Sequence, residues 1–183
     1  MIELTESRVN HAMVALKPGL DKYLSLQAML HDVDVSTDPL FQRRFNGFYK
    51  VRRKADWRRK YYELFKEVLA EGGSFRHVCE EIKKLTGRWE PSFSSKMVAS
   101  VDPTQPVIDS VVLRNLGLKL PSVRTSERLD SICIVYDDLK KRCRTLLASD
   151  TGEFVTQRFE QLYPHVKIEP IKMLDLVLWQ IRD

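Results

Sequence analysis

The stretch DWRRKYYELFKEVLAEGGSFRHVCEEIKKLTG, residues 56 to 87, decides the fold. Apolar residues recur at helical spacing on both sides of its Gly-Gly pair, which predicts two amphipathic helices. We expect Asp56 to be the N-cap of the first helix, because a short polar side chain accepts hydrogen bonds from the first free amides, and the second helix to start at Ser74. Gly87 is expected to end the second helix. Helical spacing dominates the remaining sequence too, so the chain is predicted to be all-α, with about eight or nine helices.

The bulk composition fits a protein that buries a core without disulfides or metal. The chain has 183 residues, and no apolar run approaches the roughly 20 residues needed to cross a bilayer. The start lacks the basic and apolar regions of a signal peptide, so we expect a cytoplasmic protein with no membrane partner. Cys79, Cys133 and Cys143 have no metal-ligand spacing with histidine and are expected to be buried free thiols. No motif indicates a metal or a cofactor, and the oligomeric state is not predicted.

Positive charge is concentrated in residues 41 to 66. The whole chain carries +5, whereas this segment alone carries +8, with ten lysines and arginines against two acids. Such a run can neutralise backbone phosphates and release their counterions. It therefore predicts a nucleic-acid-binding surface made by Arg43, Arg44, Lys50, Arg52, Arg53, Arg58 and Arg59. The alternative is a solvated face whose charges pair with the acidic remainder of the chain.

A single acid stands out in QPVIDSVVLRNLGL, residues 105 to 118, where Asp109 separates two apolar pairs. Its position predicts the N-cap of a short helix. A carboxylate at such a place can also stabilise a short-lived cation in a pocket that excludes water. Because an N-cap can face a pocket, the two roles do not exclude each other.

The order of these elements resembles the helix-hairpin-helix glycosylase superfamily of DNA base-excision enzymes. Two helices joined by a tight turn are followed by a proline-containing loop that brings an Asp to a short helix ending in Leu-Gly-Leu. The segment IDSVVLRNLGL is similar to the one that carries the catalytic Asp of that superfamily, and QPVIDSVV and FNGFYKVRR resemble a bacterial branch with the form P-[VI]-x-D-S-x-V. The resemblance implies a two-lobed helical bundle, with a hairpin lobe at about 56–120 and a second lobe from the N-terminal helices plus 121–183.

The resemblance also implies a function and a set of site residues. DNA would be the partner, Asp109 the catalytic carboxylate of a monofunctional N-glycosylase, and Lys96 would lie near the lysine nucleophile of bifunctional members. The alternative for Lys96 is a solvated charge. The hairpin turn, WEPSFSSKM, lacks the usual glycines, and its Ser94 and Ser95 are expected to contact phosphate. Asp175 is expected to pair with a basic residue in the core.

Whether the chain is an enzyme stays open at this point. A degenerate relative that has kept the fold and lost the chemistry has the same pattern, since fold does not fix function. The alternative from another class is a non-catalytic module that holds nucleic acid or a protein through the basic surface of residues 41 to 66.

Overall fold

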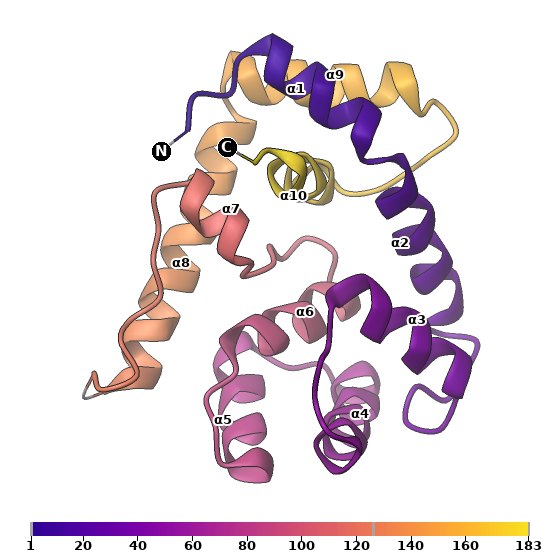
Figure 1. Cartoon of the computed structure of the whole chain (residues 1–183), viewed down its shortest axis with the longest axis vertical. Coiled ribbons are helices and arrows are strands. Elements are labelled where there is room, and N and C mark those ends of the chain that lie inside the picture. Colours follow the sequence, from indigo (N-terminus) through magenta and orange to yellow (C-terminus); the bar gives the residue numbers. More distant parts are fainter. Residues whose placement is uncertain (1, 126, 183) are drawn as a thin grey trace. The chain divides into compact units, whose positions relative to one another are not determined.

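A computed structural model describes residues 2–125 and 127–182. Every regular element in these residues is an α-helix, which confirms the all-α prediction, and ten helices are present (Figure 1). In chain order they are α1 (Glu6–Ala15), α2 (Lys17–Met29), α3 (Pro39–Tyr49), α4 (Ala55–Glu71), α5 (Phe75–Thr86), α6 (Pro91–Val101), α7 (Ser110–Asn115), α8 (Arg128–Leu147), α9 (Asp150–Leu162) and α10 (Pro170–Gln180).

The chain divides into two compact units. The central unit is Pro18–Val101, and the terminal unit combines Met1–Lys17 with Asp102–Asp183. The central unit is therefore an insertion into the terminal unit, entered in the first turn of α2 and left at the end of α6. These bounds correct the expected hairpin lobe of about 56–120, because residues 18–55 belong to the same unit as the hairpin and residues 102–120 do not.

Aromatic packing explains why α3 belongs to the same unit as α4. The Phe45 ring of α3 lies 4.7 Å from Tyr49, 5.3 Å from Phe65 and 5.9 Å from Tyr62, measured between ring centroids. Phe41 packs against Phe65 as well, at 5.9 Å. Aromatic side chains bury large areas and favour tilted or edge-on pairs, so this cluster joins α3 to α4 in one core.

The hairpin itself forms as the sequence predicts. The Ser74 side chain accepts a hydrogen bond from the His77 amide and caps α5, and Gly87 ends α5 with a positive φ of 75°. After the turn, α6 begins at Pro91 and packs against α4 and α5. The start of α4 differs from the prediction, because the N-cap is Lys54 and not Asp56. Asp56 lies in the first turn of the helix, and its carboxylate binds Arg59 and Lys60 instead.

The terminal unit is built around α10. Its residues from Ile171 to Leu178 are all buried, and α1, α7, α8 and α9 pack around it. A helix that is apolar on most of its surface is expected to lie inside its domain. The Asn115 side chain of α7 donates hydrogen bonds to the carbonyls of Leu178 at 2.8 Å and Ile181 at 2.9 Å, which fixes α7 against α10. This packing places α7 in the terminal unit.

Within the described residues, no helix combines the length and the apolar character needed to cross a membrane.

Candidate functional site

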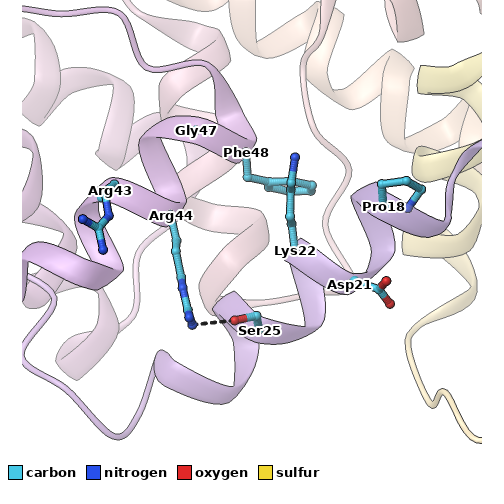
Figure 2. A pocket seen from close by; sticks show the side chains of 8 residues that line it. All are labelled: Pro18, Asp21, Lys22, Ser25, Arg43, Arg44, Gly47 and Phe48. Carbon is cyan, nitrogen blue, oxygen red and sulfur yellow. Dashed lines mark hydrogen bonds between the residues drawn. The ribbon is translucent and has the colours of Figure 1, made fainter.

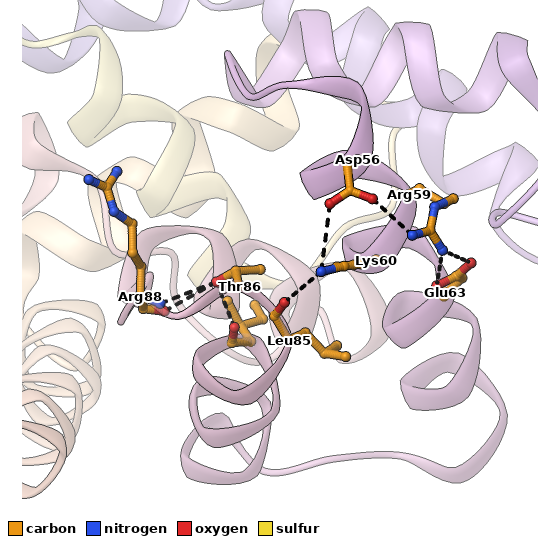
Figure 3. Close-up of polar contacts among 8 residues, drawn as sticks. Asp56, Arg59, Lys60, Glu63, Leu85, Thr86 and Arg88 are labelled. Atoms are coloured by element: carbon orange, nitrogen blue, oxygen red, sulfur yellow. Dashed lines mark hydrogen bonds and ion pairs between the residues drawn. The ribbon is translucent and has the colours of Figure 1, made fainter.

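About half of the lysines and arginines in residues 41 to 66 are engaged in contacts within the protein. Figure 3 shows the first group, at the start of α4 and the end of α5. Arg59 lies 2.9 Å from Asp56 and 3.0 Å from Glu63, and Lys60 donates to the Leu85 carbonyl at 3.1 Å. The hydrogen bond from Arg59 and the nearby charge of Lys60 lower the pKa of Asp56. Arg59 and Lys60 thus have partners on the surface of their own unit.

Arg53 is an anchor of the hairpin. Its guanidinium donates to both carboxylate oxygens of Glu90, at 2.8 and 2.9 Å, and lies over the rings of Phe93 at 5.1 Å and Trp57 at 5.8 Å. Glu90 is only 9% exposed, so the pair holds the turn before α6 onto α4. A two-point arginine–carboxylate contact of this kind is among the stronger polar interactions in proteins. For Arg53, therefore, the charge pairs within the protein, as in the alternative to a nucleic-acid contact.

Further members of the segment are also engaged. Lys66 lies 2.6 Å from Asp34, and Arg44 donates to the Ser25 hydroxyl at 2.7 Å. Lys50 is exposed and follows α3 in the left-handed conformation, with a φ of 55°.

Four cations of the segment lack such partners. Arg43, Arg52, Lys54 and Arg58 make no side-chain hydrogen bond or ion pair with any residue from 2–125 or 127–182. Arg43, Arg52 and Lys54 are exposed and Arg58 is half-buried. The charge available to a ligand is therefore smaller than the sequence total and lies at α3 and the start of α4.

Two of these cations meet in a concave site between α3 and α4, here called the arginine pocket. It has a volume of about 400 Å³ and is lined by Ser36, Pro39, Gln42, Arg43, Asn46, Ala55, Arg58 and Arg59. None of these lining residues is acidic. An arginine-rich, acid-free concavity attracts anions, and a planar guanidinium matches the oxygens of phosphate or carboxylate groups.

The neutral residues of the arginine pocket are held in place by the core. The hydroxyl of Tyr62 donates to Asn46 Oδ1 at 2.9 Å, and burial raises the pKa of Tyr62, which keeps that hydroxyl protonated. Asn46 Nδ2 remains available as a donor within the described chain. The Gln42 amide donates to the carbonyls of Val35 and Ser36 and closes the loop before α3. Asn46 and Ser36 were missed from sequence because a pocket between helices leaves no linear pattern.

A second pocket lies between α3 and α2 (Figure 2). This α2–α3 pocket has a volume of about 530 Å³ and is lined by Pro18, Asp21, Lys22, Ser25, Arg43, Arg44, Gly47 and Phe48. In Figure 2, Arg44 reaches from α3 toward Ser25 on α2, while Gly47 and Phe48 lie at the far end of α3. Arg43 lines both pockets, so the two are neighbours on one surface of the central unit.

Lys96 is buried, so its interpretation as a solvated charge is wrong. It is 8% exposed, and its Nζ donates to the Tyr49 carbonyl at 3.1 Å. The same atom lies 5.2 Å from the Phe93 ring centroid and 5.9 Å from that of Tyr49. A carbonyl and two ring faces stabilise an ammonium ion, whereas a Schiff-base nucleophile must be neutral. These contacts favour a structural cation.

Ser94 and Ser95 are fully buried, which corrects their expected exposure at the hairpin turn. The Ser94 hydroxyl donates to the Glu90 carbonyl at 3.0 Å, and the Ser95 hydroxyl donates to the Ser92 carbonyl at 3.0 Å. Small side chains bonded to their own helix allow α6 to pack closely on every side. Their burial leaves them out of the surface that is available to phosphate.

Asp109 is the N-cap of α7, as predicted. Its Oδ1 accepts a hydrogen bond from the Val111 amide at 2.8 Å, and the residue is half-buried. Within the described chain, its other carboxylate oxygen makes no hydrogen bond. Asp109 belongs to the terminal unit, whereas Lys96 and the basic segment belong to the central unit.

A buried ion pair lies in the same unit as Asp109. Lys172 Nζ is 3.2 Å from Asp175 Oδ2, which also accepts from the Val107 amide at 3.3 Å. This confirms the predicted core pairing of Asp175. Burial raises the pKa of Asp175, Lys172 opposes the rise, and the negative charge of Asp109 adds to it. Asp175 Oδ1 is buried without a hydrogen bond from the described part of the chain.

The thiols are placed for packing. Cys79 and Cys143 are buried as predicted, Cys133 is half-buried, and burial raises the pKa of the Cys143 thiol to about 12. Such a thiol is a poor nucleophile, because the thiolate is the reactive form. Among residues 2–125 and 127–182, no group of three or more His, Cys, Asp or Glu side chains is placed to hold a metal ion.

Comparison of the chain with protein-family models, with curated proteins and with solved structures gives no match. The case for a function therefore depends on the residues of this chain alone, and the resemblance to the helix-hairpin-helix glycosylases stays a prediction.

Proposed function

We propose that the protein binds nucleic acid, with DNA as the expected partner, through phosphate contacts made by its central unit. The observation that carries this proposal is the arginine pocket, where Arg43 and Arg58 line a concavity that contains no acid. The exposed side chains of Arg52 and Lys54 extend the positive surface beyond the pocket. Guanidinium groups without protein partners neutralise phosphates and release counterions, which gives affinity without sequence preference.

The test is a salt titration of DNA binding with Arg43→Ala/Arg58→Ala. A duplex of mixed sequence serves as the probe, and fluorescence anisotropy measures the affinity at several salt concentrations. Each phosphate contact that is lost should lower the slope of log K against log salt by roughly 0.9, so the double variant should lose up to about two units of slope. Affinity near physiological salt should fall by about tenfold or more.

The matched control is Arg114→Ala/Lys119→Ala, which removes the same charge from exposed positions of the terminal unit. The control should leave the slope close to that of the unchanged protein. Equal slopes for both double variants would mean that only net charge matters, and the pocket would then have no specific role. If the unchanged protein binds an acidic protein but not DNA, the non-catalytic protein-binding alternative replaces this proposal.

A second candidate function is hydrolysis of an N-glycosidic bond by Asp109. The half-buried carboxylate uses one oxygen as the α7 cap and leaves the other without a hydrogen bond from the described residues, which supports this candidate. In such a reaction the C1′–N bond breaks, the base leaves with a proton, and a water oxygen bonds to C1′. The carboxylate would stabilise the cationic sugar while the base lies outside the stack.

Asp109→Asn tests this candidate cleanly, because asparagine is also a good N-cap and preserves α7. Base release from duplexes that carry damaged bases should fall by at least about a hundredfold, as expected for the loss of a group that stabilises transition-state charge, with DNA affinity unchanged. Absence of base release by the unchanged protein on a broad lesion panel would leave the non-catalytic binding module as the function.

A further inference from the structure

Packing does not require a glycine at position 47. It lies inside α3, where glycine destabilises a helix relative to alanine. A Cβ built at this position meets no atom within 4 Å, so no neighbouring side chain or backbone requires the small residue. Its φ is not positive either, since only Gly72, Gly87 and Gly117 have positive φ among the described glycines. The space above Gly47 is the α2–α3 pocket.

The α2–α3 pocket is lined partly by apolar and partly by polar side chains. Its apolar part consists of Gly47, Pro18 and Phe48, whose ring packs inward against Tyr23 at 6.3 Å. Its polar part contains acceptor and donor groups on α2 together with the arginines of α3 (Figure 2). A pocket lined by both apolar and hydrogen-bonding groups suits a ring that carries hydrogen-bonding atoms on its edge.

The pocket also lies next to a phosphate-binding surface. Arg43 lines both the α2–α3 pocket and the arginine pocket, so a ligand in one is adjacent to an anion in the other. A nucleotide combines these two groups, because its base is a planar ring with polar edges and is joined through a sugar to a phosphate. The volume of about 530 Å³ is within the range of pockets that hold small organic ligands.

We infer that the α2–α3 pocket takes an unpaired nucleobase whose flanking phosphate lies at Arg43, so that the central unit prefers single-stranded nucleic acid to duplex. This inference rests on the proposed function and deepens it by naming the form of nucleic acid. A base in a duplex is held by its pairing partner and its stacked neighbours, and it cannot enter the pocket without unstacking. A single strand offers its bases freely, and every base has a face that can pack against an apolar wall.

Gly47→Leu is the decisive variant, because the open space at this position allows the side chain to fill the pocket without a clash. The probes are an unstructured thymidine 12-mer, a 12-base-pair duplex, and a 12-mer of abasic sites that keeps the phosphates and lacks the bases. Gly47→Leu should weaken binding of the thymidine strand by at least about fivefold, in line with the loss of one base contact. Duplex and abasic affinities should change by less than about twofold, since phosphate contacts remain.

Gly47→Ala is the matched control, because a methyl group occupies little of the pocket and favours the helix. It should keep the preference for the thymidine strand and raise the melting temperature. If the abasic strand binds as tightly as the thymidine strand, or if Gly47→Leu leaves the thymidine affinity unchanged, the base pocket is ruled out while phosphate binding stands. If Arg43→Ala/Arg58→Ala leaves every affinity unchanged, the proposed function itself fails.

Discussion

The two units place charged side chains in opposite environments. The terminal unit contains the Lys172–Asp175 pair, and the central unit contains Arg43 and Arg58. The first is sealed inside a helical core, with side chains that are 3% and 7% exposed. The second pair has no ion partner among the described residues and lines a concave surface. A buried pair costs desolvation and is destabilising to break, whereas surface charge contributes little to stability and is free to bind. The charges that support the fold are therefore different from those to which we assign the proposed binding.

The largest expected effect comes from breaking the buried pair. Asp175→Ala removes the carboxylate beside Lys172 and should lower the free energy of unfolding by about 3–5 kcal/mol, as for other buried ion pairs that lose one member. Hydrogen exchange of the α10 amides would report the loss in the terminal unit. Asp138→Ala, at an exposed position of α8, is the control and should change stability by no more than about 0.5 kcal/mol. Equal effects of the two variants would contradict the structural role of the pair.

An intermediate effect is expected at the hairpin. Glu90→Ala leaves Arg53 without its two-point partner and should cost about 2 kcal/mol, less than at Asp175 because the Arg53 side chain is 35% exposed. Urea unfolding followed by circular dichroism measures the change. Glu63→Ala breaks the exposed contact with Arg59 and should lower the stability much less than Glu90→Ala does. Equal losses of stability in the two variants would mean that the Arg53–Glu90 contact stabilises the fold no more than an exposed ion pair does.

A smaller effect separates the two roles of Asp109. Asp109→Ala removes the side-chain acceptor for the Val111 amide and should cost about 1 kcal/mol, whereas Asp109→Asn should be nearly neutral. Thermal unfolding of both variants gives the comparison. A loss of several kcal/mol in Asp109→Asn would mean that the negative charge itself supports the fold, which would weaken the catalytic candidate.

The smallest effect belongs to an exposed pair. Hydrogen bonds from Lys66 and Ser36 lower the pKa of Asp34 to about 2, although the carboxylate is exposed. Because the folded pKa is lower than the unfolded one, the pair contributes stability above about pH 4 and loses it as the pH falls toward 2. Carboxyl NMR titration should give a midpoint near 2 for Asp34. Lys66→Ala should move the midpoint up toward 3.8, and an unchanged midpoint would exclude Lys66 as the cause.

Local rules predicted the helices well, because caps and helix ends depend on neighbouring residues. The predicted helix from Ser74 to Gly87 is present as α5, and Asp109 is the predicted N-cap of α7. Asp56 does not, because Arg59 and Lys60 on the next turn bind its carboxylate, and the preceding Lys54 becomes the N-cap. Competition between a cap and an ion pair is decided by side-chain geometry that sequence spacing does not contain.

The candidate sites were harder to predict, since they depend on which helices meet. The serines of α6 form a polar pattern typical of an exposed helix, yet their small size allows burial and their hydroxyls bind the helix backbone. The basic segment was recognised, but only the contacts with Glu90 and Asp34 separate anchoring cations from available ones. A usable sequence signal for the α2–α3 pocket existed in Gly47, a glycine inside a predicted helix.

The position of α10 has a consequence for synthesis on the ribosome. The central unit is one continuous segment, so all its helices have emerged long before translation reaches Pro170. The terminal unit must wait, because the helix that fills its interior is made last. Until then the helices that surround α10 in the finished unit lack the partner that they share, and the terminal unit cannot complete its core.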